Sequence, residues 1–200
     1  MRSTAIFSTS FVLGILIGVF SPLSRSLFKS DLSLYALYLL LFLIGIGIGS
    51  NTEAWQTIKR LNIRIVLVPL SVIFGTFAGV GLFSVLLSEI NLRESLAIGA
   101  GFGYYSLSSI LIAQIRGETL GVLALLSNII REITTLLITP LLSKYFGNLA
   151  PIASGGATSM DTTLPIITRF TGKQYAMISV FSGIVLTLAA PFFIVLFLKI

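Results

Sequence analysis

The sequence contains no cysteine and no histidine. These absences exclude disulfides, thiol chemistry, haem, and zinc or iron sites that depend on histidine. A Ser-His-Asp triad is excluded for the same reason. We therefore predict no metal, no cofactor and no enzymatic activity. Any proton chemistry must use carboxylates, lysine, arginine or tyrosine.

Charge is also scarce, because only 10% of the 200 residues are charged while 56% are hydrophobic. Soluble domains carry about 25% charged residues, so the mean hydropathy of +1.04 indicates that lipid is the solvent for most of the chain. The net charge of +6 is spread between apolar runs, as in cytoplasmic loops. It forms no basic stripe with interleaved aromatics, so we predict no nucleic-acid binding.

The apolar runs predict one integral membrane domain over residues 1–200, an all-α bundle of six or seven transmembrane helices. A spanning helix needs about 20 residues. We predict spans near 4–22, 32–50, 64–88, 94–114, 119–143 and 174–198, with 150–168 as a broken or re-entrant segment. Further apolar runs follow the first segment at once, so we interpret it as a retained helix rather than a signal peptide.

Two segments depart from the apolar pattern, near 99–109 and 154–165, and in each a glycine cluster precedes a run of hydroxyls. Glycine permits unwinding, and unwound backbone at membrane depth must line a cavity or be buried in protein. Such breaks in corresponding positions point to the binding site of a transporter. The candidate residues here are Tyr104, Tyr105, Ser106, Gly155, Gly156, Thr158, Ser159 and Thr162.

Asp161 is the most informative residue, because it lies in the second of these segments, far in sequence from any lysine or arginine except Arg169. A carboxylate inside a membrane is costly unless it is paired or hydrated. We expect the hydroxyls of Thr158, Ser159, Thr162 and Thr163 to donate to it. The alternative is a structural role, in which Asp161 or Ser159 caps a half-helix.

The run near 119–143 holds three further candidates, Asn128, Arg131 and Glu132, which make a polar face inside an apolar helix. They predict either a substrate and proton site or a buried network that locks the bundle. Arg131 and Glu132 need not pair with each other, and we expect one of them to face Asp161 and the other a cavity. The tyrosines have an alternative role as interfacial anchors.

These residues predict a secondary transporter of a small polar or charged solute. The alternatives are a cation-conducting channel with Asp161 as its selectivity charge, and a non-catalytic membrane subunit of a larger transport complex. A membrane-embedded enzyme is disfavoured, because the chain has few convergent carboxylates besides lacking histidine and cysteine.

Three stretches resemble the LysO family of lysine exporters. They are Gly103-Tyr104-Tyr105-Ser106-Leu107-Ser108, Leu125 to Glu132 (LLSNIIRE), and Gly155 to Pro165 (GGATSMDTTLP), the last being the most specific. The resemblance covers about the whole chain. It implies a multi-pass protein of a prokaryotic inner membrane that exports L-lysine, and also toxic lysine analogues, using the proton gradient. By motif match, Asp161 is the intramembrane acid that the family needs.

The resemblance also implies that the chain corresponds to the C-terminal two-thirds of longer family members. The hydrophobic N-terminal region of those members carries another intramembrane acid. We therefore expect either a separate small membrane subunit or a homo-oligomer. For lysine, we expect Asp161 and Glu132 to attract the ammonium groups, and backbone N–H groups freed near Gly101–Gly103 and Gly155–Gly156 to bind the carboxylate.

Overall fold

The computed structural model describes residues 65–86 and 90–199, together with a few isolated positions before residue 65. The chain divides into two compact units, Met1–Ile44 and Gly45–Ile200. In the first unit the described positions, such as Leu13 and Leu39, are helical. The predicted spans near 4–22 and 32–50 lie outside the described residues.

In the second unit, three helices are long and apolar enough to cross a membrane. They are α5 (Leu67–Ser84), α8 (Glu118–Phe146), and the run Lys173–Lys199, which comprises η3 (Lys173–Tyr175) and α11 (Ala176–Lys199). They correspond to three of the longest apolar runs in the sequence. Every regular element in the described ranges is a helix, so the predicted all-α membrane fold is confirmed.

The segment near 94–114, which we predicted as a span with a glycine-rich break, is broken there into a pair of helices that does not form one continuous crossing. Helix α6 (Leu92–Gly99) begins at a capping box, in which Asn91 and Glu94 exchange side-chain and backbone hydrogen bonds. A turn over residues 100–104 separates it from α7 (Tyr105–Arg116). In this turn Gly103 has φ +100° and Phe102 has φ +48°, so the backbone leaves the right-handed helical region.

A second pair follows α8. Helix α9 (Ala150–Gly155) leads into the 3-10 helix η2 (Gly156–Met160), and α10 (Leu164–Thr171) follows after a short turn. Gly156 has φ +62° where the α-helical path stops. Each of these helices is too short to span a bilayer. We call α6, the turn and α7 the first hairpin, and α9, η2 and α10 the second hairpin.

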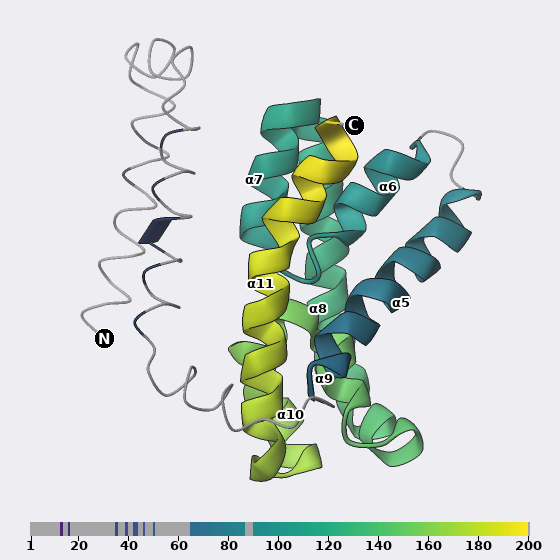
Figure 1. Cartoon of the computed structure of the whole chain (residues 1–200), viewed down its shortest axis with the longest axis vertical. Coiled ribbons are helices and arrows are strands. Elements are labelled where there is room, and N and C mark those ends of the chain that lie inside the picture. Colours follow the sequence, from purple (N-terminus) through teal and green to yellow (C-terminus); the bar gives the residue numbers. More distant parts are fainter. Residues whose placement is uncertain are drawn as a thin grey trace. The chain divides into compact units, whose positions relative to one another are not determined.

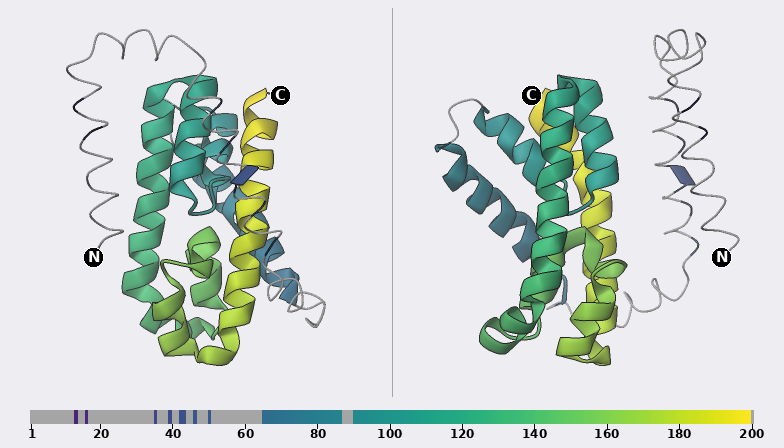
Figure 2. Two further views of the ribbon diagram at one scale, coloured as in Figure 1. Left: turned by 90° about the vertical axis from the view of Figure 1, so that its left-hand side faces the viewer. Right: turned by 180° about the vertical axis from the view of Figure 1, so that it is seen from behind.

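The two hairpins enter the second unit from opposite ends. Figure 1 shows α6 and α7 beside the C-terminal end of α11, and α10 beside its N-terminal end; Figure 2 shows the same arrangement from two other sides. Two hydrogen bonds agree with this placement. Arg116 at the end of α7 donates to Leu198 O (3.2 Å), and Ser143 near the end of α8 donates to Phe170 O in α10 (3.2 Å).

Apolar packing fixes each hairpin against the long helices. The ring of Phe102, fully buried at the tip of the first hairpin, lies 5.5 Å from that of Phe77 and 6.2 Å from that of Phe193, measured between centroids. The second hairpin is anchored by Ile152 and Ile167, which are buried against Val68 of α5. Because close-packed interiors resist small displacements, the hairpin tips have defined positions.

Candidate functional site

The tips of the two hairpins meet and are joined through their backbones. Ala157 N donates to Phe102 O across the contact (2.8 Å). A Cβ added to Gly103 would lie 3.0 Å from Gly155 O, which leaves no room for a side chain between the two hairpin tips. Glycine is therefore required at position 103, both because φ is positive there and because the two hairpin tips approach each other so closely.

Helix α8 supplies the group that holds the first hairpin. The Oδ1 atom of buried Asn128 accepts a hydrogen bond from Gly103 N (2.7 Å), and its Nδ2 donates to Ala124 O (2.8 Å). Weaker contacts run from the same amide to Ile98 O (3.5 Å) and Ser108 Oγ (3.4 Å). Asn128 thus satisfies backbone groups that the broken helix leaves unpaired.

Arg131, one turn further along α8, holds the second hairpin in the same way. Its Nε donates to Ser154 O (2.9 Å) and its Nη2 to Ala153 O (3.0 Å), while Nη1 reaches Thr76 Oγ1 of α5 (3.4 Å). These carbonyls close α9, where a cation is favoured by the helix dipole. Arg131 is therefore bonded to these groups rather than to Asp161.

Replacing Arg131 with methionine is expected to lower the stability of the protein by about 3 kcal/mol, because two partly buried carbonyls lose their donors. The measurement is thermal unfolding in detergent. Arg116→Met is the control, since Arg116 is exposed and its one bond to the described residues goes to Leu198 O. Equal melting temperatures for the two variants would show that Arg131 does not hold the hairpin.

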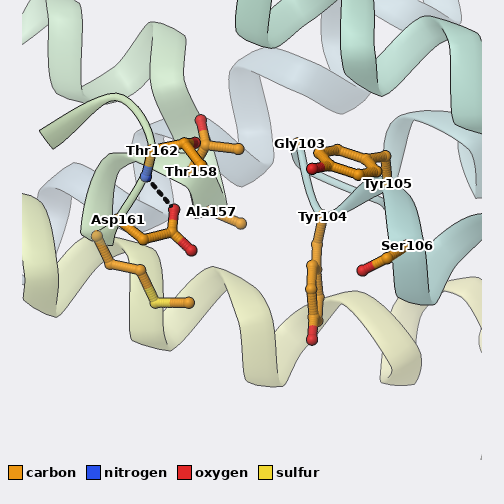
Figure 3. Close-up of a pocket in the computed structure, with 9 residues that line it drawn as sticks. Gly103, Tyr104, Tyr105, Ser106, Ala157, Thr158, Asp161 and Thr162 are labelled. Atoms are coloured by element: carbon orange, nitrogen blue, oxygen red, sulfur yellow. Dashed lines mark hydrogen bonds between the residues drawn. The ribbon is translucent and has the colours of Figure 1, made fainter. Parts of the chain in front are cut away.

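A cavity of about 150 Å³ lies where the hairpins meet, and residues of both hairpins line it. Figure 3 shows the two walls facing each other. The first hairpin contributes Gly103, Tyr104, Tyr105 and Ser106, and the second contributes Ala157, Thr158, Met160, Asp161 and Thr162. Asp161 is the one charged residue among these nine, so the cavity favours a cation.

Asp161 lies in the turn between η2 and α10, and its carboxylate is exposed on the cavity wall. Its Oδ1 accepts a hydrogen bond from Thr162 N (2.6 Å). The N-cap residue of α10 is Thr163, without a side-chain capping bond, so Asp161 does not cap this helix. The carboxylate therefore keeps capacity to accept further hydrogen bonds.

The hydroxyls that we expected to serve Asp161 are directed elsewhere. Thr158 donates to Gly155 O (2.9 Å), and Ser159 bonds to Gly156 O (2.7 Å) and Ser179 O (2.9 Å). Thr163 pairs with Thr158 at 3.5 Å. The tight 3-10 turn brings these short side chains back to carbonyls three residues earlier. These three hydroxyls stabilise the tip of the second hairpin and are not bonded to Asp161.

The predicted anion-binding N–H groups are also occupied. Gly103 N donates to Asn128, Ala157 N to Phe102 O, Gly101 N to Ile98 O (3.2 Å), and Gly156 N to Ile152 O. The expectation that these N–H groups bind the substrate carboxylate is therefore wrong, because each of them already donates to a group within or between the two hairpins or to Asn128. Gly155, Gly156 and Ser159 do not line the cavity, but they belong to the second hairpin, whose tip forms one of its walls.

Six of the predicted residues line the cavity, and Asp161 is the charged one among them. They are Tyr104, Tyr105, Ser106, Thr158, Asp161 and Thr162. Asn128 and Arg131 hold the hairpins, and Glu132 lies on α8 outside the lining. Sequence reasoning did not select Ala157 and Met160, although both stand in the motif around Asp161. It also missed Phe102, whose role rests on a backbone carbonyl that no side-chain pattern reveals.

Comparison with known proteins gives one family and two relatives. The family model described as "Lysine exporter LysO" matches residues 8–198. The protein named "Lysine exporter LysO" of Escherichia coli (strain K12) is 33% identical over 186 residues, or 93% of this chain and 61% of its own length. A Haemophilus influenzae protein named "Putative lysine exporter" is 31% identical over 170 residues, or 85% of this chain and 86% of its own. The chain thus spans less than two thirds of the Escherichia coli relative. No solved structure matches it.

Proposed function

The chain belongs to the lysine exporter LysO family, as a multi-pass protein of the inner membrane, and we propose that it is a secondary transporter that exports L-lysine in exchange for protons. One observation carries the proposal. A single carboxylate, Asp161, lines a cavity at the meeting point of two broken helices that enter the bundle from opposite ends. Broken helices that meet around a charged residue are typical of transporter binding sites.

Asp161 is proposed to hold either a proton or an ammonium group, but not both. The carboxylate has one hydrogen bond, from Thr162 N, and its remaining lone pairs face the cavity. Binding of a proton from outside releases the ammonium, and loss of that proton inside allows the next lysine to bind. This competition couples outward movement of lysine to inward movement of protons.

The cavity fits part of a lysine molecule. Its volume of about 150 Å³ is comparable with that of an apolar cavity that accepts benzene. A benzene molecule is about the size of a lysine side chain. Tyr104, Tyr105 and Ser106 line the wall opposite Asp161, and their hydroxyls are proposed to bind the carboxylate of the substrate. Toxic lysine analogues that keep the ammonium group and this length fit the same site.

Alternating access follows from the opposed hairpins. Each hairpin reaches the cavity from one end of the bundle, so a small displacement of one tip opens a path from that end alone. The hydrogen bond from Ala157 N to Phe102 O is then the contact that each transition changes. Packed elements of this kind have discrete arrangements rather than a continuum.

The experiment that tests the proposal is lysine counterflow in proteoliposomes. We expect saturable exchange that an inward proton gradient accelerates, with and without a second membrane segment that completes the length of the Escherichia coli relative, supplied as a partner subunit or a second copy. Electrical recording provides the control. Conductance without exchange identifies a cation channel, and absence of exchange under all conditions points to a non-catalytic subunit.

A further inference from the structure

Helix α9 ends at buried Gly155, and the last four carbonyls of a helix have no partner within it. Neighbouring groups of the second hairpin satisfy two of the four, Ile152 O and Gly155 O. The other two, Ala153 O and Ser154 O, accept hydrogen bonds from Arg131 Nη2 (3.0 Å) and Nε (2.9 Å). A positive charge from another helix therefore completes the end of α9.

This charge is fixed to the protein at membrane depth. Arg131 is the fourteenth of the 29 residues of α8, so it stands near the middle of a membrane-spanning helix. Its guanidinium makes no ion pair with any carboxylate in the part of the chain that the structure describes. A charge in this position is costly unless polar groups replace its water. Neutral oxygens do so here, namely the two carbonyls and Thr76 Oγ1 of α5 (3.4 Å).

Gly156 allows the guanidinium to approach the break in the helix closely. A Cβ added to this glycine would lie 2.9 Å from Arg131 Nη2 and 3.2 Å from Arg131 Cζ. The next residue, Ala157, lines the cavity. The cation therefore stands directly behind the hairpin tip that forms one wall of the proposed substrate site.

Neutral oxygens at the end of a broken helix are also ligands for small metal ions. In transporters with discontinuous helices, freed carbonyls and the C-terminal ends of half-helices coordinate Na⁺. Ca²⁺ and Mg²⁺ sites are built largely with carboxylates, so two carbonyls and a hydroxyl suit a monovalent ion. At the end of α9 these oxygens surround a side chain of the protein instead.

We propose that the guanidinium of Arg131 takes the place of a bound metal ion at the end of α9, so that the protein needs no Na⁺, and that removal of this side chain uncovers a Na⁺ site. The consequence for transport rests on the function proposed above. A fixed cation holds the second hairpin throughout the cycle, whereas a dissociable ion would release the hairpin tip whenever it left. Coupling is then left to protons.

The first test is thermal unfolding of the whole protein in detergent at 1 mM and 300 mM NaCl, with choline chloride keeping the ionic strength constant. Arg131→Ala leaves the two carbonyls free and makes room for an ion with its water. We expect its melting temperature to rise by roughly 4–8 °C at the higher Na⁺ concentration, as for a ligand at about 30 times its Kd. Arg131→Met fills the same space without charge and should show no such rise, nor should the wild-type protein or Arg116→Ala.

The second test is lysine counterflow in proteoliposomes that contain either Na⁺ or choline on both sides. We expect the wild-type protein to exchange lysine at the same rate in both. Arg131→Ala should exchange lysine roughly 10-fold faster in Na⁺ than in choline, because the bound ion restores the position of the second hairpin. Arg131→Met should be equally slow in both.

A melting temperature of Arg131→Ala that does not respond to Na⁺ overturns the inference, and so does a wild-type protein that exchanges lysine in Na⁺ alone. If Arg131→Ala does not fold, Arg131→Lys decides. This variant keeps a positive charge, so it should melt above Arg131→Met, and equal melting temperatures would show that charge contributes nothing at this position. Failure of the wild type to exchange lysine in either salt rejects the proposed function, while the melting temperatures still test the Na⁺ site.

Discussion

Asp161→Asn is expected to reduce lysine efflux by roughly 100-fold and to abolish its response to a proton gradient. Asparagine has the same shape but cannot take up a proton, and it has no negative charge to attract an ammonium group. The loss of one hydrogen bond to a charged group accounts for about 1.5–3 kcal/mol of binding. The measurement is efflux of labelled lysine from proteoliposomes, with and without an imposed pH difference.

The fold of this variant is expected to remain intact, which makes the result interpretable. Asp161 is exposed on the cavity wall, and its one recorded bond, from Thr162 N, can be accepted equally by an asparagine Oδ1. The change in unfolding free energy should lie within about 0.5 kcal/mol. Asp161→Glu, which keeps the charge, is the matched control. Efflux at the wild-type rate in Asp161→Asn would refute the coupling mechanism.

The positions of the helices and of their breaks could be predicted from the sequence because both depend on local composition. The apolar runs that became α5, α8 and α11 have the length and hydropathy of membrane helices. Gly103 and Gly156 stand where the backbone adopts positive φ, so the glycine clusters identified both interruptions. Asp161 was singled out because a carboxylate is rare in such surroundings.

The folding back of the first hairpin could not be predicted, since it depends on contacts between distant segments. Phe102 has a positive φ without being glycine, and its carbonyl meets Ala157 N from the other hairpin. Nothing near Phe102 in the sequence indicates that bond. An apolar run with glycines is compatible with a kinked crossing as well as with a hairpin, and tertiary packing decides between them.

Side-chain partners were predicted less well, because nearness in sequence was taken as nearness in space. Thr158 and Ser159 stand within three residues of Asp161, yet the 3-10 turn directs their hydroxyls to Gly155 O and Gly156 O. Arg131 is charged and close to the site, yet it serves the carbonyls at the end of α9. In each case an unpaired backbone group competed for the side chain, and buried carbonyls need such partners.

Gly156→Ala is the second substitution with a large expected effect, because it acts on the contact between the two hairpin tips. The added Cβ would overlap Phe102 O and would lie 2.9 Å from Arg131 Nη2 and 3.2 Å from Arg131 Cζ. The backbone at φ +62° also disfavours any residue other than glycine. Backbone strain lowers the free energy of unfolding by about 1–3 kcal/mol, and the weakened hydrogen bond between Ala157 N and Phe102 O lowers it by a comparable amount.

We expect Gly156→Ala to lose lysine transport and to unfold at a clearly lower temperature in detergent than the wild-type protein. Gly147→Ala is the matched control. Gly147 has φ +85° at the end of α8, but nothing lies within 4 Å of its added Cβ, so this variant carries the backbone strain without the overlap. It should keep transport and melt above Gly156→Ala. If both variants melt together and transport alike, the contact between the hairpin tips contributes nothing beyond the strain at one glycine, and the proposed path of alternating access fails with it.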